Sequence, residues 1–305
     1  MFSEEKLQAA FKAFIDKKVL IFTFDLLQQQ SVSYKNSKIS FLTAGNGQKL
    51  VICFPGYGED ASSCSFLGKY GGSEFTFIAI DLPFHGKTRW EEGLDFHWED
   101  LKNIVAIILK THFSENTPGK EKITLLGFSL GGRLALSLYQ SIPEQVQKVV
   151  LLAPDGLKIN FWYWLATQTG IGNRFFKFTM KRPSWFFGFL KLLNHFGFVN
   201  ASIFKFVNYY IGDQKVRELL YLRWTTLRRL KPDLQKIKTL IRLHGTFFHL
   251  VYGKHDRIIL PTRGKKFRTG IEKYCTLSVI ESGHQVLHEK HAADIVAALR
   301  SSSIG

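Results

Sequence analysis

Cysteines, acidic residues and long apolar runs are all scarce in this chain of 305 residues. The three cysteines are Cys53, Cys64 and Cys275. Such an odd, sparse set argues against a disulfide scaffold and is typical of a reducing compartment. No CxxC pair or Cys/His cluster has the spacing of zinc ligands, so we expect neither a metal nor a cofactor.

The first residues lack the features of a secretory signal. The opening MFSEEKLQAA carries acidic residues where a signal peptide has positive charge, and no A-x-A site follows the apolar run Val19–Leu27. That run has nine residues, well short of the roughly 20 that a membrane-spanning helix needs. We therefore expect a soluble, cytoplasmic protein.

The overall composition is that of a globular protein with an excess of positive charge. Hydrophobic residues make up 45% and charged residues 22%, which excludes wholesale disorder and collagen-like structure. The length allows one large domain, or one domain with an insertion. Lysine and arginine number 41 against 25 aspartates and glutamates, a formal charge of +16 that favours an anionic partner.

Apolar stretches that alternate with helical patterns predict an α/β fold. Residues 31–45 predict two short strands around an Asn-Ser turn. Helices are predicted at Leu101–Lys110, Leu130–Gln140 and Gln285–Leu299. Short apolar strands between helices indicate a mostly parallel central sheet with helices on both faces. The predicted apolar strands cover residues 49–54, 76–81, 122–128, 148–154, 247–253 and 275–280.

The alternation stops between Pro154 and Phe247, where no convincing strand occurs. Residues 158–242 contain 16 basic and only three acidic residues, and residues 158–210 contain 17 aromatic residues. Helices are predicted near 184–196, at 215–230 and from Pro232 to Gly245. In the first of these, the predicted apolar face holds Trp185, Phe186, Phe189, Leu193 and Phe196.

These patterns divide the chain into three parts. Residues 31–157 and 243–305 form an α/β core, and residues 158–242 form a helical cap that is basic and rich in aromatic residues. Residues 1–30 form an N-terminal helical extension. It contains an amphipathic helix at 3–17 and then the apolar run Val19–Leu27, which fits a helix or a strand.

The motif GFSLG at 127–131 lies between a predicted strand and a predicted helix. This is the context of a nucleophile elbow, in which a strained turn projects a serine hydroxyl above the sheet edge. Gly127 and Gly131 have no Cβ to collide with the neighbouring chain at such a turn. The amide of Leu130, at the start of the helix, can donate to an oxyanion. The sequence therefore predicts Ser129 as a nucleophile.

A serine nucleophile needs a base and a carboxylate that orients the base. Asp256 follows the strand predicted at 247–253, and His284 follows the one at 275–280. Both side chains, like Ser129, stand at the carboxyl end of a strand. Because open α/β sheets bind ligands at that edge, all three can meet there.

Five ordered motifs give the chain a wider resemblance: FPGYGED, DLPFHGKT, GFSLGG, GKHDRIILP and SGHQVLHE. Over about residues 31–154 and 243–300 it resembles an α/β-hydrolase-fold serine hydrolase with a helical cap. The resemblance implies that Ser129 is the nucleophile, His284 the base and then acid, and Asp256 the orienting carboxylate. It further implies an oxyanion hole made by the amides of Leu130 and Tyr57, although many relatives have His-Gly where this chain has Pro55-Gly56.

Other polar residues near these motifs have alternative interpretations. Asp155 follows the strand predicted at 148–154 and is the alternative acid, because some members of the family take the carboxylate from that strand. The resemblance assigns Asp81 and His85 to a structural turn. His288 and His291 are expected on a surface helix after His284. The buried-strand positions of Cys53 and Cys275 predict small core residues, and Cys64 is expected to be inert.

The sequence thus predicts a serine-dependent hydrolase that acts through an acyl-enzyme, most simply on carboxylic esters with apolar acyl groups. A thioesterase, a C–C bond hydrolase or an acyltransferase would use the same residues. From another class, a non-catalytic, membrane-associated binding protein on the same fold remains an alternative.

The expected partner is a small-molecule acyl substrate. The basic cap fits a solvated surface, an anionic membrane surface or an acidic substrate. We expect no nucleic acid, because no RRM, OB or helix-turn-helix signal occurs. The sequence leaves the oligomeric state open.

Overall fold

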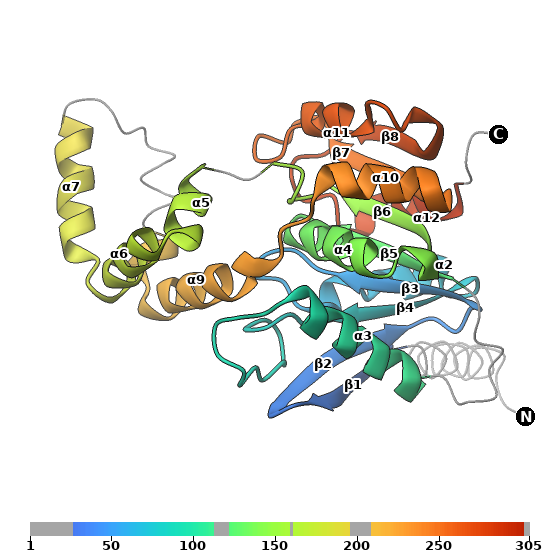
Figure 1. Cartoon of the computed structure of the whole chain (residues 1–305), viewed down its shortest axis with the longest axis horizontal. Coiled ribbons are helices and arrows are strands. Elements are labelled where there is room, and N and C mark those ends of the chain that lie inside the picture. Colours follow the sequence, from blue (N-terminus) through green and yellow to red (C-terminus); the bar gives the residue numbers. More distant parts are fainter. Residues whose placement is uncertain (1–26, 113–121, 159–160, 196–208, 302–305) are drawn as a thin grey trace, which may run out of the picture.

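The computed structural model describes residues 27–112, 122–158, 161–195 and 209–301 (Figure 1). The helix predicted at 3–17 lies outside the described residues, and so does the apolar run Val19–Leu27 except for its last residue. The N-terminal extension expected at 1–30 is therefore described only from Leu27, where the first strand begins.

An eight-stranded sheet forms the centre of the molecule, in the order β1-β2-β4-β3-β5-β6-β7-β8. The pairs β1·β2 and β2·β4 are antiparallel and all others are parallel, which confirms the predicted fold class. The strands are β1 (Leu27–Tyr34), β2 (Ser37–Ala44), β3 (Lys49–Phe54), β4 (Phe75–Ile80), β5 (Ile123–Phe128), β6 (Val146–Leu152), β7 (Phe247–Gly253) and β8 (Cys275–Ile280).

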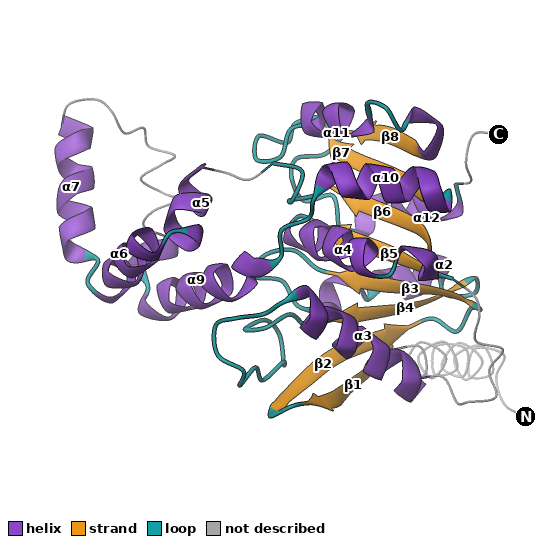
Figure 2. Cartoon of the chain, in the orientation of Figure 1, coloured by secondary structure: helices purple, strands orange, loops and turns teal. Residues whose placement is uncertain are grey.

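Helices cover both faces of this sheet (Figure 2). One layer, in front in Figure 1, contains α3 (Trp98–His112), α4 (Leu130–Ser141) and α10 (Leu234–His244). The other contains α2 (Phe66–Gly71) and α12 (Ala292–Arg300), which contact each other. Strands β4 and β5 are buried along their whole length, which explains why they read as continuous apolar runs. The remaining core helix, α11 (Pro261–Arg268), packs against β8 and β7.

Two local predictions for the core are wrong. The turn between the first two strands consists of Lys35 and Asn36, and Ser37 already belongs to β2; Lys35 has φ 53°. The helix predicted from Gln285 begins only at Ala292, after a 3-10 turn at Glu289–His291. The ring of His291 bonds Ser282 over 2.9 Å, which holds residues 282–291 as a compact loop instead of a helix.

The segment expected to form a cap, residues 158–242, is mainly helical where the structure describes it and extends away from the sheet (Figure 1), except for α10, which packs beside α4. The helices of the cap itself are α5 (Phe161–Gln168), α6 (Gly170–Lys181), α7 (Ser184–His195) and α9 (Gln214–Thr226). It has a small core of its own, in which Phe176 and Met180 of α6 pack with Leu190 of α7 and Tyr221 of α9.

One predicted helix face in the cap is partly wrong. In α7, Trp185, Phe186 and Leu193 are half-buried as expected, but Phe189 is exposed and Leu190 is the buried residue. Phe196 lies outside the described residues. The sequence WFFGFLKLL is apolar on several sides, so its periodicity does not specify which side meets α6.

Candidate active site

Ser129 occupies the sharp turn between β5 and α4. Its backbone angles, φ 48° and ψ −114°, are strained for a residue with a side chain. A Cβ on Gly131 would lie 1.9 Å from the Phe54 carbonyl oxygen, and one on Gly127 would lie 2.5 Å from the Gly131 carbonyl oxygen. Both positions therefore require glycine, as the elbow predicts. Hydrogen bonds to β6 and the segment after it hold the turn: the Ser129 amide donates to Leu152, and the Asp155 amide donates to Ser129.

His284 lies in hydrogen-bond contact with both Ser129 and Asp256. Its Nε2 is 3.0 Å from the Ser129 Oγ, and its Nδ1 is 2.8 Å from the Asp256 Oδ2. A carboxylate only accepts, so Nδ1 carries the proton and Nε2 presents a lone pair to the serine hydroxyl. The structure therefore brings together the three side chains that the sequence selected from separate strands.

Asp256 is held in place by the loop after β7. Its side chain is fully buried, and Oδ1 accepts hydrogen bonds from the amides of Ile258 at 2.7 Å and Ile259 at 2.9 Å. These bonds replace the water that a buried carboxylate loses. The second oxygen, Oδ2, is thereby aimed at His284.

The His284 side chain itself is partly open, with 20% of its surface exposed. Its ring lies 5.5 Å from that of Phe128, the residue before the elbow serine. The imidazole is therefore packed on one side and accessible on the other, an arrangement that a base acting on substrate requires.

The two amides expected to form an oxyanion hole belong to the elbow and to the loop after β3. Leu130 is the first residue of α4, and the first four amides of a helix have no acceptor within it. Tyr57 lies in the loop after β3, next to Gly56, where a Cβ would come within 2.9 Å of the Phe128 ring. The loop of Tyr57 thus packs directly against the elbow.

Glu59 is a structural link that the sequence did not single out. Its Oε2 accepts from the Gly56 amide at 3.0 Å, and its Oε1 accepts from the Gln285 side chain at 2.7 Å. One carboxylate thus joins the loop of Tyr57 to the residue after His284. The motif FPGYGED contains Glu59, but only the fold brings Gln285 to it.

Asp155, the alternative acid, has a different set of partners. It pairs with the Arg133 guanidinium of α4 and accepts from the Gly156 amide. Arg133 also donates to the Tyr163 hydroxyl of α5 at 2.6 Å. Asp155 therefore stands at the junction of core and cap, while His284 bonds Asp256.

Arg223 of α9 forms a second contact between cap and core, which the sequence also missed. Its Nε donates to the Phe84 carbonyl at 2.9 Å, and its guanidinium lies 5.4 Å from the centre of the Tyr57 ring. Burial raises the pKa of Tyr57 to about 12 despite the nearby cation. The cap thus packs directly on the loop that carries the Tyr57 amide.

The turn DLPFHGKT has the contacts of a structural element. Asp81 accepts from the amides of Ala61 at 2.7 Å and Lys87 at 2.9 Å. His85 is buried, its Nδ1 donates to the Pro83 carbonyl, and burial together with Arg223 lowers its pKa to about 3. The imidazole is therefore neutral and fixed, consistent with a turn.

The structure also places the remaining histidines and cysteines. The helix predicted for His288 and His291 is absent: His288 caps a 3-10 turn and His291 is buried. All three cysteines are free and buried, and burial raises the pKa of the thiols of Cys53 and Cys275. Within the described residues, no group of three or more His, Cys, Asp or Glu side chains could hold a metal ion.

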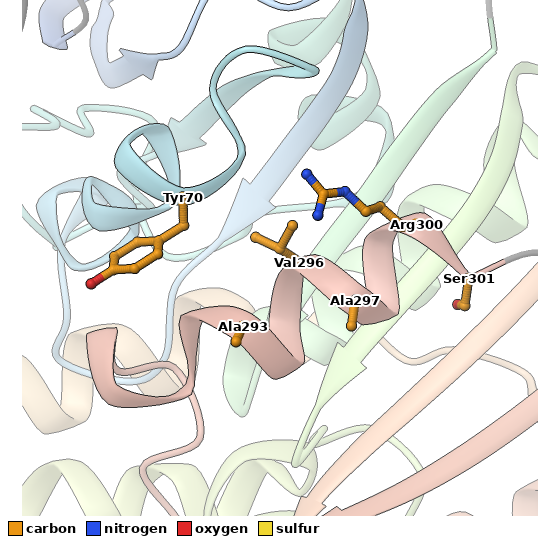
Figure 3. A pocket seen from close by; sticks show the side chains of 6 residues that line it. All are labelled: Tyr70, Ala293, Val296, Ala297, Arg300 and Ser301. Atoms are coloured by element: carbon orange, nitrogen blue, oxygen red, sulfur yellow. The ribbon is translucent and has the colours of Figure 1, made fainter.

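A cavity of about 580 Å³ lies between α2 and α12, away from the elbow (Figure 3). It contains none of the residues placed near Ser129. Its lining residues are Tyr70, Ala293, Val296, Ala297, Arg300 and Ser301.

In the part of the chain that the structure describes, no helix combines the length and apolar character needed to cross a bilayer.

Comparisons with known proteins agree with this fold. A family model for the alpha/beta hydrolase fold matches residues 49–197. An uncharacterized hydrolase of Bacillus subtilis, YugF, is 24% identical over 257 residues, which cover 82% of this chain and 90% of the relative. Other curated relatives match over 118 to 133 residues, and the chain spans less than half of each.

Solved structures are similar over almost the whole chain. A thermophilic esterase from Thermogutta terrifontis has a TM-score of 0.63 at 15% identity, and 90% of this chain and 98% of that one are covered. A membrane phospholipase A described as a bacterial virulence factor has a TM-score of 0.60 at 18% identity, with 96% and 94% covered. At such identities the likeness concerns the fold. Together with the family match and the sheet order, it shows that this chain has the alpha/beta hydrolase fold.

Proposed function

We propose that this protein is a serine hydrolase that cleaves carboxylic esters through an acyl-enzyme. The observation that carries the proposal is the pair of contacts made by His284, 3.0 Å to the Ser129 hydroxyl and 2.8 Å to the Asp256 carboxylate. A nucleophile, a base and an orienting acid in this arrangement are the parts that nucleophilic acyl transfer requires.

In the proposed first step, the Ser129 Oγ attacks the ester carbonyl carbon while His284 Nε2 takes the hydroxyl proton. Asp256 stabilises the resulting imidazolium through Nδ1–H. His284 then gives the proton to the leaving alkoxide, the C–O bond breaks, and an acyl group remains on Ser129. Water attacks this acyl group with His284 again as base, which releases the acid and restores the serine.

The negative charge on the carbonyl oxygen needs hydrogen-bond donors in both steps. The amides of Leu130 and Tyr57 are proposed for this role, because they belong to the elbow helix and to the loop packed against the elbow. Removing one such donor from a hydrolase typically costs about 3–4 kcal/mol of transition-state stabilisation. Since both donors are main-chain groups, the Pro55-Gly56 sequence leaves them intact.

We assign the substrate class to esters with an apolar acyl group. The cap that contacts the Tyr57 loop is rich in aromatic side chains, and aromatic side chains are typical of sites that bind lipophilic substrates. Two structural neighbours are described as an esterase and a phospholipase A, and both act on esters in name. A thioesterase, a C–C bond hydrolase and an acyltransferase remain alternative functions of the same three residues.

A fluorophosphonate probe tests the nucleophile. We expect it to label the wild-type chain and not the Ser129→Ala variant, while Ser137→Ala, in the same helix, is labelled like the wild type. Absence of labelling in both the wild type and the Ser137→Ala control, beside a control hydrolase that is labelled, would contradict the proposal and favour a non-catalytic protein.

A matched series of acyl donors separates the alternative reactions. We expect p-nitrophenyl esters to be hydrolysed with kcat/KM rising from acetate to medium-chain acyl groups. The corresponding acyl thioesters should react more slowly. Faster turnover of the thioester at the same chain length would reassign the protein as a thioesterase, and a preference for acetate would contradict an apolar acyl site.

A further inference from the structure

Helix α6 presents an apolar stripe to solvent. Ile171, Phe175 and Phe178 are 84%, 54% and 47% exposed. Their spacing of four and three residues places them on one side of the helix. The opposite side, with Phe176 and Met180, packs into the small core of the cap. Most of the stripe therefore faces solvent, and its one ring contact among the described residues of the cap is that of Phe175 with Trp185, 5.0 Å between ring centres.

Basic side chains border this stripe. Arg174 lies one helical turn before Phe178 and Lys181 lies one turn after it, and both are exposed. Arg182 follows at the end of the helix. From Lys158 to Gly212 the chain has seven basic residues and no acidic residue. An apolar stripe with such a cationic border is the composition of a helix that lies in a membrane interface.

Neighbouring cap helices extend the same character. In α5, Phe161 and Trp162 are more than half exposed, and in α7 Leu192 is also exposed beside Lys191. Figure 1 shows these helices at the end of the molecule farthest from strand β8 and helix α12. The core has no counterpart among its described helices: exposed large apolar residues there, such as Leu243 of α10, occur singly.

We propose that the α6 stripe, Ile171, Phe175 and Phe178 with Arg174 and Lys181, docks on the surface of anionic lipid. The aromatic side chains enter the boundary between headgroups and acyl chains, and the cations pair with lipid phosphates. Charge selects this occupant over a second copy of the chain, because two uniformly cationic surfaces would repel each other. Salt screens the attraction between basic residues and anionic lipid, so binding should weaken as ionic strength rises.

The test is sedimentation of the full chain with vesicles of phosphatidylcholine alone or mixed with phosphatidylglycerol. All proteins carry Ser129→Ala, so that binding is measured without hydrolysis and its outcome is independent of the proposed function. We expect recovery with the mixed vesicles, little with the neutral ones, and loss of binding at high salt. Equal recovery from both kinds of vesicle would overturn the proposal.

Paired variants locate the surface. Phe175→Ser with Phe178→Ser, and separately Arg174→Glu with Lys181→Glu, should each weaken binding to the mixed vesicles by about ten-fold or more. The matched core variants, Leu243→Ser and Lys265→Glu with Lys266→Glu, should change it by less than about two-fold. Equal weakening by cap and core variants would overturn the assignment to α6.

A second copy of the chain is the competing occupant, and size-exclusion chromatography distinguishes it. The lipid proposal would be replaced by a dimer under two conditions: the protein does not sediment with mixed vesicles, and the double variant Phe175→Ser with Phe178→Ser converts its dimer to a monomer. Circular dichroism of each variant verifies that the cap remains helical, so that a loss of binding reports on the surface.

Discussion

Helices α4 and α7 are both twelve residues long, and their surroundings differ sharply. Ten residues of α4 are buried, whereas Leu190 alone is buried in α7. The first helix lies between the sheet and its neighbours and begins at the strained Ser129. The second lies at the outer side of the cap. In the core, packing fixes the turn that carries Ser129, and in the cap it leaves much of the helix surface exposed.

The same contrast holds for charge. Ionic groups near the elbow are paired or hydrogen-bonded, as Asp256 and Arg133 are. Cations along α6 and α7 face solvent in a stretch that has no acidic residue. Burial makes an unpaired charge costly, so the buried charges near the elbow are satisfied internally, whereas the cations of α6 and α7 remain in solvent.

The largest expected effect on kcat comes from a comparison of the two candidate acids. Asp256 lies at the rim of the core, and Asp155 lies at the junction of core and cap. Asp256→Asn should lower kcat for ester hydrolysis by about 10³–10⁴-fold, because the imidazole loses the acceptor that fixes its tautomer. Asp155→Asn should lower kcat by less than about ten-fold and instead lower the melting temperature, since buried Arg133 loses its counter-ion. Steady-state kinetics and thermal unfolding of both variants measure this. The reverse pattern would make Asp155 the acid.

A pair of glycines tests the packing contrast directly. Gly131→Ala places a methyl group against the Phe54 carbonyl and should destabilise the protein by about 3 kcal/mol or prevent folding. At Gly188, inside α7, an added methyl group would meet no atom within 4 Å, so Gly188→Ala should stabilise the helix by up to about 1 kcal/mol. Urea unfolding of both variants gives the two free energies. Similar changes in the free energy of unfolding for the two variants would contradict the difference in packing between core and cap.

His85, beneath the contact between Tyr57 and the cap, predicts a pH dependence of stability. Burial lowers its pKa to about 3 in the folded protein, so below the unfolded value of about 6.5 the unfolded chain binds a proton that the folded one does not. Stability is fully present above pH 6.5 and falls as the pH drops, by about 2 kcal/mol between pH 6.5 and 5. The free energy of unfolding in urea should fall in this way for the wild type, and this contribution should be missing in His85→Gln. Parallel pH profiles would show that His85 does not titrate as its burial requires.

The smallest expected effect belongs to Glu59, which links the Tyr57 loop to Gln285. Glu59→Gln changes one of its two acceptor oxygens to a donor and should reduce kcat by about ten-fold through displacement of the loop, with KM nearly unchanged. Exposed Glu218→Gln in α9 is the matched cap control and should leave both constants as they are. A loss confined to KM would show that Glu59 acts on substrate binding and not on the loop.

Much of the core was predictable because local sequence and burial agree there. Apolar runs such as KLVICF and ITLLGF are strands because both faces of a parallel sheet are covered, and GFSLG allows little besides a sharp turn before a helix. The residues Ser129, Asp256 and His284 could be selected because each follows a strand. In the cap, periodicity did not predict the buried face of α7, because apolar residues occur on several sides of that helix.

By itself, the sequence determined the α/β class of the fold, the basic and aromatic character of the cap, and which side chains stand at strand ends, since these depend on local pattern and composition. Only the tertiary structure decided that His284 bonds Asp256 and not Asp155, that Glu59 reaches Gln285, and that Arg223 packs on Tyr57. It also decided which face of α6 remains open to solvent. Each of these depends on distances between segments far apart in the chain, and such distances are set by the packing of the whole molecule.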